Sequence, residues 1–344
     1  MKTFLTLFIV ASQSVAALAQ DYDGKTPYIT KSLASDAISS VVVSTSAGGI
    51  SVSGESGQAP RIEVYIKGNN NQELTKEEIE KRLSEDYEMN VSVNGHELTA
   101  TVKNRHEFSN WRKQMSISFK IYVPQHVSTD LKTSGGGIHL DNLTGTETFR
   151  TSGGGLQLDK LSGTINGHTS GGGIDVSNSS DDIDLQTSGG GITAKHCDGK
   201  IKLVTSGGGL ILKDLKGTIN AHTSGGGVEG DHIEGELVTG TSGGGIELRH
   251  MNCSLDANTS AGSLSAQMEH VGGYLKLHTS AGNIDLELPA KQGLDLNLYG
   301  ESVGQAPSGF NGEWKKGHVS GSINGGGAQV SASASSGDVT VGFK

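Results

Sequence analysis

Hydrophobic and polar residues recur with a period of 18 residues along the middle of the chain. Each repeat opens with Thr-Ser-Gly-Gly-Gly and an apolar residue, and the last repeat opens with the variant Thr-Ser-Ala-Gly. The opening residues are Thr133, Thr151, Thr169, Thr187, Thr205, Thr223, Thr241 and Thr259. A constant short period is typical of repeat proteins, in which each unit packs against its neighbours in the chain.

Each repeat, counted from its threonine as position 1, carries several columns of apolar residues. Positions 6 and 8 are mostly apolar, as in Ile138 and Leu140, and this alternation predicts a strand with one buried face. Positions 11 and 15 add two further columns, with members Leu143, Leu161, Leu215, Ile233 and Met251 at position 11, and Ile165, Ile183, Ile201, Ile219, Leu237 and Leu255 at position 15. Glycine fills positions 3 to 5 and most instances of position 13, which predicts a turn after each strand because glycine adopts positive φ readily.

We therefore expect an all-β fold, a parallel β-solenoid (β-helix) of about 18-residue coils that lie ~4.8 Å apart. A helical repeat is excluded, because no 3.6-residue period appears and three adjacent glycines would break a helix. The threonine at position 1 follows the second strand. Its side chain either points inward in a stacked ladder, with the serine at position 2 outward, or both residues simply suit a turn.

The chain before the repeats divides into two parts. Residues 1–19 have the charged start, apolar run and small-residue end of a secretory signal peptide. Residues 20–130 are expected to hold a first coil near residue 40 and a capping region with one short helix at 74–87. Thr75 and Glu78 form a capping-box pattern at its start. A hairpin with strands at 90–93 and 97–102 follows, with Asn94-Gly95 as its turn. The helix and hairpins are candidates for covering the open end of the solenoid.

The regular coils are expected over 131–288, and 289–344 is expected to be an irregular hairpin followed by C-terminal coils. Residues 289–318 break the period with Pro289, Pro307 and Trp314. The coil phrases resume at Gly321 and at Ser335, so 319–344 is interpreted as the final coils.

Composition sharpens this interpretation. Glycine accounts for 52 of 344 residues and aromatic residues for only 5%, which favours a core of thin aliphatic layers. The formal charge is −10, or −11 once residues 1–19 and their single Lys2 are removed, which argues against nucleic-acid partners. No segment after residue 19 is long and apolar enough for a transmembrane helix, so we expect an exported, soluble mature chain in the periplasm, at the cell surface or outside the cell.

The two cysteines, Cys197 and Cys253, lie at positions 11 and 13 of coils that are three apart. Three coils correspond to ~14 Å, whereas a disulfide needs Cα atoms within ~7 Å. We expect two free, largely buried thiols.

The acidic residues and histidines do not form the patterns that known site chemistries require. Asp181, Asp182 and Asp184 cluster in one coil only, whereas a calcium β-roll repeats an aspartate in every turn. A zinc site needs three or four converging ligands, and His168, His222 and His278 recur too far apart for that.

A glycan-cleaving enzyme needs paired carboxylates, but the acids are scattered without a repeated partner: Asp159, Asp214, Glu229, Asp231, Glu234 and Glu236. An ice-binding face needs Thr-x-Thr rows, and position 3 is glycine. We therefore expect no catalytic, cofactor-binding or metal-binding residues and no cofactor; the binding residues are unknown.

The coil phrase Thr-Ser-Gly-Gly-Gly-Ile, the strand Ile121-Tyr-Val-Pro124 and the closing Ser-Ser-Gly-Asp-Val resemble a bacterial family. It is the "putative adhesin" family of β-strand-repeat proteins of unknown function, related to the auto-transporter adhesin "head GIN" domains, whose name is echoed by Ile165-Asn-Gly167. The resemblance covers about 40–344 and implies a bacterial envelope protein with a β-solenoid fold.

The functional expectation is a non-enzymatic, adhesin-like binding or scaffolding protein of the cell envelope, with an envelope glycan or a surface protein as partner. An envelope-stress sensor and a polysaccharide-active β-helix enzyme are the alternatives. The sequence does not separate adhesion from sensing.

Overall fold

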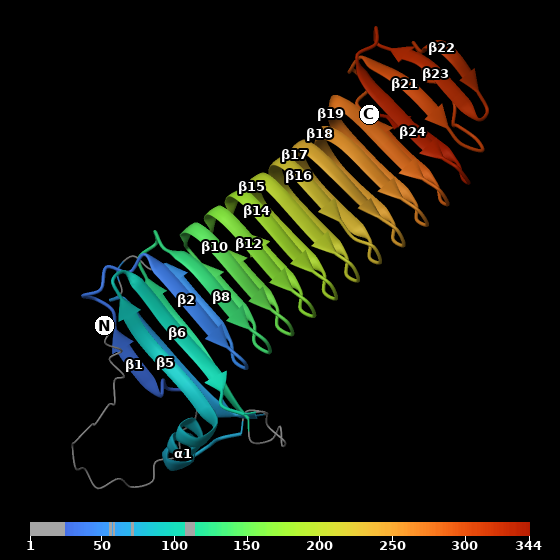
Figure 1. The fold of residues 1–344 in the computed structure, drawn as a ribbon. Coiled ribbons are helices and arrows are strands. Elements are labelled where there is room, and N and C mark those ends of the chain that lie inside the picture. Colours follow the sequence, from blue (N-terminus) through green and yellow to red (C-terminus); the bar gives the residue numbers. More distant parts are fainter. Residues whose placement is uncertain (1–24, 55–56, 58, 70–71, 107–113) are drawn as a thin grey trace, which may run out of the picture.

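The computed structural model describes residues 25–54, 57, 59–69, 72–106 and 114–344. Over these residues the chain forms one elongated parallel β-solenoid with a single helix at its N-terminal end (Figure 1). The expected fold class is confirmed. The predicted signal peptide, 1–19, lies outside the described residues. No helix among the described residues is long and apolar enough to cross a membrane.

Each coil consists of two strands that meet at a corner. The first strand begins at position 6, and the second ends at the threonine that opens the next coil. The first strands include β3 (Ile50–Gly54), β9 (Ile138–Asp141), β11 (Leu156–Asp159) and β13 (Ile174–Ser177). The second strands include β2 (Ser40–Thr45), β8 (Ser128–Thr133), β10 (Thr144–Thr151), β12 (Ser162–Thr169) and β14 (Ser180–Thr187).

From Ile192 onward, one continuous strand runs through the corner of each coil. These strands are β15 (Ile192–Thr205), β16 (Leu210–His222), β17 (Val228–Thr241), β18 (Ile246–Thr259) and β19 (Leu264–Thr279). Residues 18 apart pair in parallel register, as Ile183 does with Ile201. The register shifts between β18 and β19, so that Leu255 pairs with Leu275, because this coil has two extra residues.

The core is a stack of aliphatic layers that runs the length of the solenoid. Side chains at positions 6, 8, 11 and 15 point inward, as the apolar columns predicted; Ile174, Val176 and Ile183 are each at most 2% exposed. Position 17 is a further inward column that the apolar pattern of the sequence did not predict, with members Phe149, Leu185, Leu203 and Ala221. Both cysteines are buried and free, as expected.

The position-1 threonines point inward, and their hydroxyls bond to backbone rather than to one another. Thr169 Oγ1 donates a hydrogen bond of 2.7 Å to the carbonyl of Gly154 in the preceding coil, and it accepts one from the backbone N–H of Gly172 in its own turn. The same pair of bonds recurs at Thr151, Thr187, Thr205 and Thr241. Each threonine therefore links two successive turns.

The glycines at position 4 are needed for a reason other than the expected positive φ. A Cβ on Gly172 would lie 2.1 Å from the carbonyl oxygen of Gly154, because the turns of adjacent coils stack backbone on backbone. Position 13 does match the expectation, since Gly163 and Gly217 have φ of 102° and 111°.

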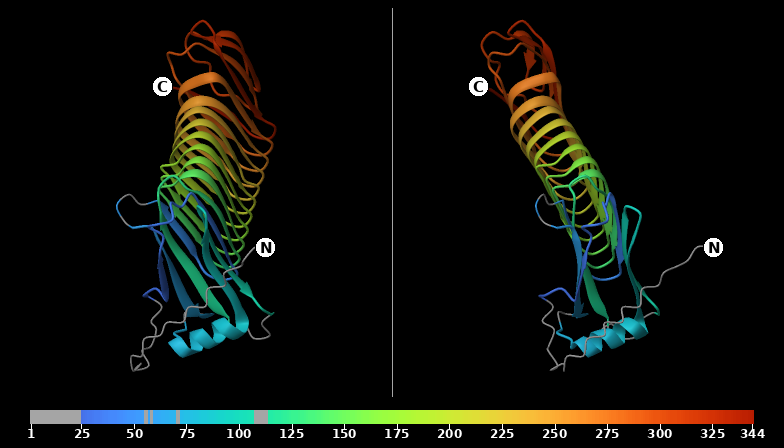
Figure 2. Two further views of the ribbon diagram at one scale, coloured as in Figure 1. Left: turned by 60° about the vertical axis from the view of Figure 1, so that its left-hand side comes forward. Right: turned by 90° about the vertical axis from the view of Figure 1, so that its left-hand side faces the viewer.

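The N-terminal end is covered by an excursion of the chain. After β3, the chain forms β4 (Arg61–Gly68), α1 (Lys76–Asp86), β5 (Tyr87–Asn94), β6 (Glu97–Asn104) and β7 (Met115–Val123), and only then returns to β8. Strands β6 and β7 pair with the outer edges of β2 and β3. Strands β5 and β4 then pair antiparallel with β6 and β7, and β1 (Ile29–Ser32) with β4. Helix α1 lies across the N-terminal end of the solenoid, next to these strands (Figure 2).

Two local predictions in this region have clear outcomes. The capping box of Thr75 and Glu78 is present at the start of α1, with both reciprocal hydrogen bonds. The β5–β6 hairpin turns at Gly95 and His96, one residue later than expected, because Asn94 still pairs with Glu97 and Gly95 takes a φ of 61°.

The C-terminal end has a comparable excursion. Strand β20 (Ile284–Leu288) is followed by β21 (Leu294–Tyr299), β22 (Asn311–Lys315) and β23 (His318–Ile323), and the chain ends with β24 (Ala328–Ala334) and β25 (Val339–Phe343). Strand β23 is antiparallel to both β21 and β22, so the final coil starts at Ala328 rather than at 319 as expected. Strand β24 lies between β19 and β21. The β22–β23 hairpin covers the outer edge of β21, because β23 pairs with that strand.

Candidate functional site

A groove runs across the outer face of the first strands near the N-terminal end of the solenoid. It has a volume of about 590 Å³ and crosses β7, β3, β9, β11 and β13. Its lining residues are Gly49, Ile50, Ser51, Ser118, Phe119, Lys120, Gly137, Ile138, His139, Gly155, Leu156, Gln157, Gly173 and Asp175. We call this feature the strand-face groove.

Glycine at position 5 hollows the groove. Gly137, Gly155 and Gly173 succeed one another at this position, and without side chains they leave a shallow trough beside the strands. The neighbouring position 7 points outward and raises one wall. The repeat that builds the core therefore also produces an elongated surface feature.

The outward side chains at position 7 form a row in strict register. Lys120 pairs with Ser51, Ser51 with His139, His139 with Gln157, and Gln157 with Asp175. The row passes from a cation to an anion through hydrogen-bonding groups spaced ~4.8 Å apart. Such a row suits an extended polar ligand lying along the solenoid axis.

A second feature lies at the corner between the two strands of each coil. Position 10 has a left-handed backbone in seven successive coils although none of its residues is glycine; the residues are Asn142, Lys160, Asn178, His196, Asp214, His232 and His250. Asparagine, aspartate and histidine tolerate this conformation better than most residues do. The shared backbone geometry turns these side chains outward in one row.

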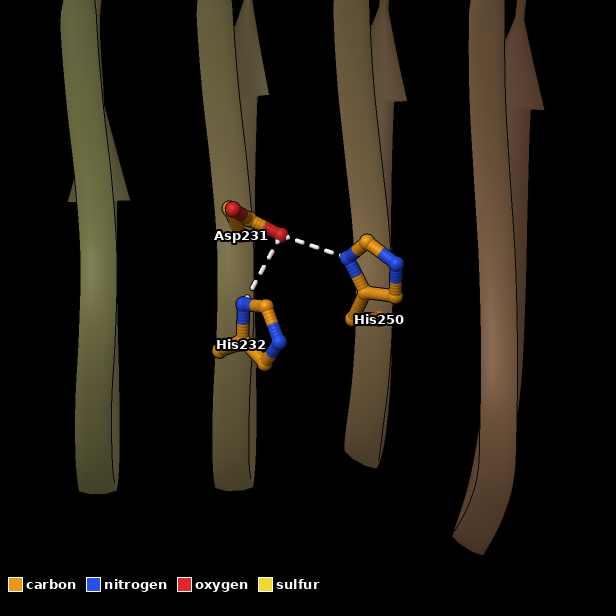
Figure 3. Close-up of side chains that lie close together, drawn as sticks. All are labelled: Asp231, His232 and His250. Carbon is orange, nitrogen blue, oxygen red and sulfur yellow. Dashed lines mark hydrogen bonds and ion pairs between the residues drawn. The ribbon is translucent and has the colours of Figure 1, made fainter.

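Near the C-terminal end of this row, Asp231, His232 and His250 converge (Figure 3). We call these three residues the histidine corner. Oδ1 of Asp231 lies 3.0 Å from Nδ1 of His232 and 2.8 Å from Nδ1 of His250. The two imidazole rings stack with centroids 4.6 Å apart and an angle of 19° between their planes. The hydrogen bond from His250, with a further contribution from His232, lowers the pKa of Asp231.

The acids considered as catalytic candidates are mostly engaged with neighbouring coils. Asp159 lies 2.6 Å from Lys160 Nζ, which together with Asn178 and Ser177 lowers the pKa of Asp159 to about 2. Glu236 accepts a hydrogen bond of 2.6 Å from the Tyr274 hydroxyl, and this bond raises the pKa of Tyr274 to about 12. Asp214 and Glu234 face His196 and Lys216. Glu229 lines a small hollow beside Asp231.

The calcium candidates also have partners. Asp181 accepts a hydrogen bond from the backbone N–H of Gly163, and Asp182 lies 3.9 Å from Lys200 Nζ. Asp184 lies 2.9 Å from Lys202 Nζ. These contacts join adjacent coils.

The three histidines singled out in the sequence, His168, His222 and His278, each immediately precede the threonine that opens the next coil, on the second strands of separate coils. The histidines that converge are others. His232 and His250 share position 10, and their 18-residue separation was the signal that would have found them.

Comparisons with known proteins found one matching family model and two similar solved structures. The family model Toastrack DUF4097 matches residues 38–342. A "putative cell adhesion protein" from Clostridium sporogenes aligns over 92% of this chain and 98% of its own, with 8% identity and a TM-score of 0.20. A "putative adhesin" from Bacteroides fragilis aligns over 92% and 96%, with 12% identity and a TM-score of 0.23.

At these TM-scores the two solved structures carry no conclusion about this chain. No curated protein is similar to it at a significant level. The family match agrees with the resemblance found in the coil phrase and spans nearly all of the described residues. The chain belongs to the Toastrack DUF4097 family.

Proposed function

We propose that this protein is an exported, adhesin-like binding module of the cell envelope, which holds an extended polar ligand in the strand-face groove without transforming it chemically. The observation that carries the proposal is the in-register row Lys120, Ser51, His139, Gln157 and Asp175 along a groove of about 590 Å³. An extended envelope glycan or an extended segment of a surface protein has the shape and polarity for this row.

The floor of the groove is formed by exposed glycine backbone. Gly137, Gly155 and Gly173 contribute main-chain atoms between the polar side chains, whereas Ile138 and Leu156 are at most 1% exposed and point into the core. Main-chain atoms and a few placed polar groups are common components of ligand sites. A sugar or a peptide carries the hydroxyl, amide or carbonyl groups that such an arrangement can bind.

Export is supported by the pattern of residues 1–19, with Lys2 before the apolar run and Ala17-Leu-Ala19 at its end. A glycine-rich solenoid with a net negative charge and many hydrogen-bonding side chains suits an aqueous envelope compartment. The family resemblance of the coil phrase also implies an envelope protein.

The test is a glycan array together with a pull-down from envelope fractions, using the purified protein and two double variants. Gln157→Ala with Asp175→Ala removes two members of the row. Asn166→Ala with Asn220→Ala is the matched control, because both asparagines are exposed on second strands away from the groove. The proposal predicts retention of a ligand by the wild type and the control, and at least about tenfold weaker retention by the groove variant.

Retention that is equal in both variants would overturn the assignment to the groove. Release of new reducing ends from a retained glycan would contradict a non-enzymatic role. Recovery of one specific envelope protein, with no glycan retained, would favour the sensor form of the same binding function.

A further inference from the structure

The histidine corner differs from the other charged clusters on the solenoid in the atoms that it brings together. In other clusters a carboxylate faces one basic side chain, as Asp184 faces Lys202 and Asp214 faces His196. Here, two imidazole nitrogens and one carboxylate oxygen face a common point. Among the residues that the structure describes, these are the one group of three histidine, cysteine or acidic side chains whose ligand atoms lie within 4.8 Å of one another.

The spacing of these atoms fits a coordinated metal ion. Two ligand atoms of a tetrahedral ion, each ~2.1 Å from it, lie ~3.4 Å apart. The corner has separations of 3.0 Å and 2.8 Å from Asp231 Oδ1 to the Nδ1 atoms of His232 and His250, which are hydrogen-bond distances only slightly shorter than this. A small opening of the side chains would therefore place an ion between all three atoms.

The backbone arranges this set in advance. His232 and His250 have almost the same left-handed conformation, with φ of 53° and 50°, so their rings leave adjacent coils in the same direction. Asp231 immediately precedes His232 in β17 and supplies the shared oxygen. Two parallel strands held in register by the stack fix the separation of the three ligands, which lowers the cost of ordering them around an ion.

The surroundings favour a metal that prefers nitrogen ligands. Lys213 and Arg249 are the backbone partners of Asp231 in the coils on either side, and Arg249 forms an ion pair with Glu247. One carboxylate with two imidazoles is a poor ligand set for calcium or magnesium, which need several oxygen ligands. Two imidazoles with one carboxylate suit zinc, nickel or copper. The side chains are between 39% and 56% exposed, so water can complete the coordination shell.

We propose that Asp231, His232 and His250 bind one divalent transition-metal ion of the zinc, nickel and copper class on the outer corner of the solenoid. Each histidine binds through Nδ1 and carries its hydrogen on Nε2, and Asp231 binds through Oδ1. The site lies on β17 and β18, several coils from the strand-face groove, so its occupancy and ligand binding in the groove are separate properties.

Isothermal titration of the chelator-treated, full-length protein with Zn²⁺, Ni²⁺ and Cu²⁺ tests the site. We expect one high-affinity site per chain, and at least about tenfold weaker binding in each of Asp231→Asn, His232→Ala and His250→Ala. His278→Ala is the matched control, because it removes an exposed histidine from another face, and it should bind as the wild type does.

Electron paramagnetic resonance of the Cu²⁺-loaded protein provides an independent readout. The expected spectrum shows hyperfine coupling to two imidazole nitrogens in the wild type and to one in His250→Ala. Binding that is unchanged in all three corner variants, or lost equally in His278→Ala, would overturn the proposal, as would the absence of binding for all three metal ions.

Discussion

The hydroxyl of Thr151 donates a hydrogen bond of 2.7 Å to the carbonyl oxygen of Gly136 in the preceding coil. The same oxygen atom of Thr151 accepts a hydrogen bond of 3.3 Å from the N–H of Gly154 in its own turn. One buried side chain thus binds backbone groups of two stacked turns. The repetition of this contact from coil to coil explains why the sequence returns to threonine every 18 residues.

Replacement of Thr151 by valine keeps the shape of the side chain and removes its hydroxyl. We expect Thr151→Val to lower the free energy of unfolding by about 1–3 kcal/mol, because a buried carbonyl and a turn N–H each lose a partner. Ser152→Ala is the control, since Ser152 is exposed, and it should change stability by less than about 0.5 kcal/mol. Chemical denaturation followed by circular dichroism measures both, and equal effects would contradict the role assigned to the threonine.

Because the turns stack on one another, adjacent glycines differ in how much space a side chain would have. A Cβ on Gly154 would lie 2.1 Å from the carbonyl oxygen of Gly136, whereas a Cβ on Gly153 would approach its nearest neighbour to 3.5 Å. We expect Gly154→Ala to destabilise the protein severely, by several times the effect of Gly153→Ala, because only the former forces two backbones apart. Thermal unfolding of the two variants checks this difference, and similar melting temperatures would refute the close-stacking explanation.

Phe149 fills the space left by the missing side chain of Gly167 in the next coil. A Cβ on Gly167 would lie 2.2 Å from Cε2 of the Phe149 ring. Gly167→Ala should therefore cost about 1–3 kcal/mol through overpacking. Combining it with Phe149→Leu should recover part of that loss, which would appear as a favourable coupling in a double-mutant cycle. Strictly additive effects would show that the two residues do not share one packing site.

Glu147 places a carboxyl group in an apolar column. It occupies position 15, where the next two coils have Ile165 and Ile183, and it is 0% exposed. Thr129 donates a hydrogen bond of 2.5 Å to Oε2, but Oε1 has no hydrogen-bond partner among the described residues. Burial, partly offset by the Thr129 bond, raises the pKa of Glu147 from 4.5 to about 7.

This raised pKa gives stability a defined pH dependence. Between pH 4.5 and about 7 the folded chain holds a proton on Glu147 that the unfolded chain has released. The contribution of Glu147 is thus most favourable below pH 4.5, and it declines by about 3 kcal/mol as the pH rises to about 7.

Denaturation at pH 5 and pH 8 tests this behaviour. Glu147→Gln should remove the decline, and Glu147→Ile should raise the stability at pH 8, because it restores the aliphatic column. A wild-type protein whose stability changes with pH in the same way as that of Glu147→Gln would contradict the assignment.

The sequence period was sufficient to predict the solenoid because side chains 18 residues apart meet in every coil. The apolar columns at positions 6, 8, 11 and 15 identified most of the core directly. The column at position 17 was not predicted, because Phe149, Gly167 and Ala221 share no residue type. Large and small residues at this position nevertheless fill the same layer together, as Phe149 does beside Gly167. The final hairpin was misassigned because Gly325 to Gly327 resemble a coil turn, yet they connect an antiparallel strand to the last coil.

The candidate sites were harder to predict, since they depend on outward positions that carry no hydrophobic signal. To predict the strand-face groove, one must know that the glycines at position 5 lie at the surface and that the side chains at position 7 point outward. The histidine corner requires the left-handed bend at position 10, which occurs at His232 and His250 without a glycine to mark it. Register alone would have placed these two histidines side by side.

The most direct test of the central claim, that the repeats build an extended binding row, is the affinity for a retained ligand measured as a function of ligand length. The five strands under the groove span about 19 Å, or four intervals of ~4.8 Å. Affinity should rise with oligomer length until the ligand spans this row and then level off, and the rise should disappear in Gln157→Ala with Asp175→Ala. An affinity that is independent of ligand length, or a rise that persists in this variant, would contradict the account.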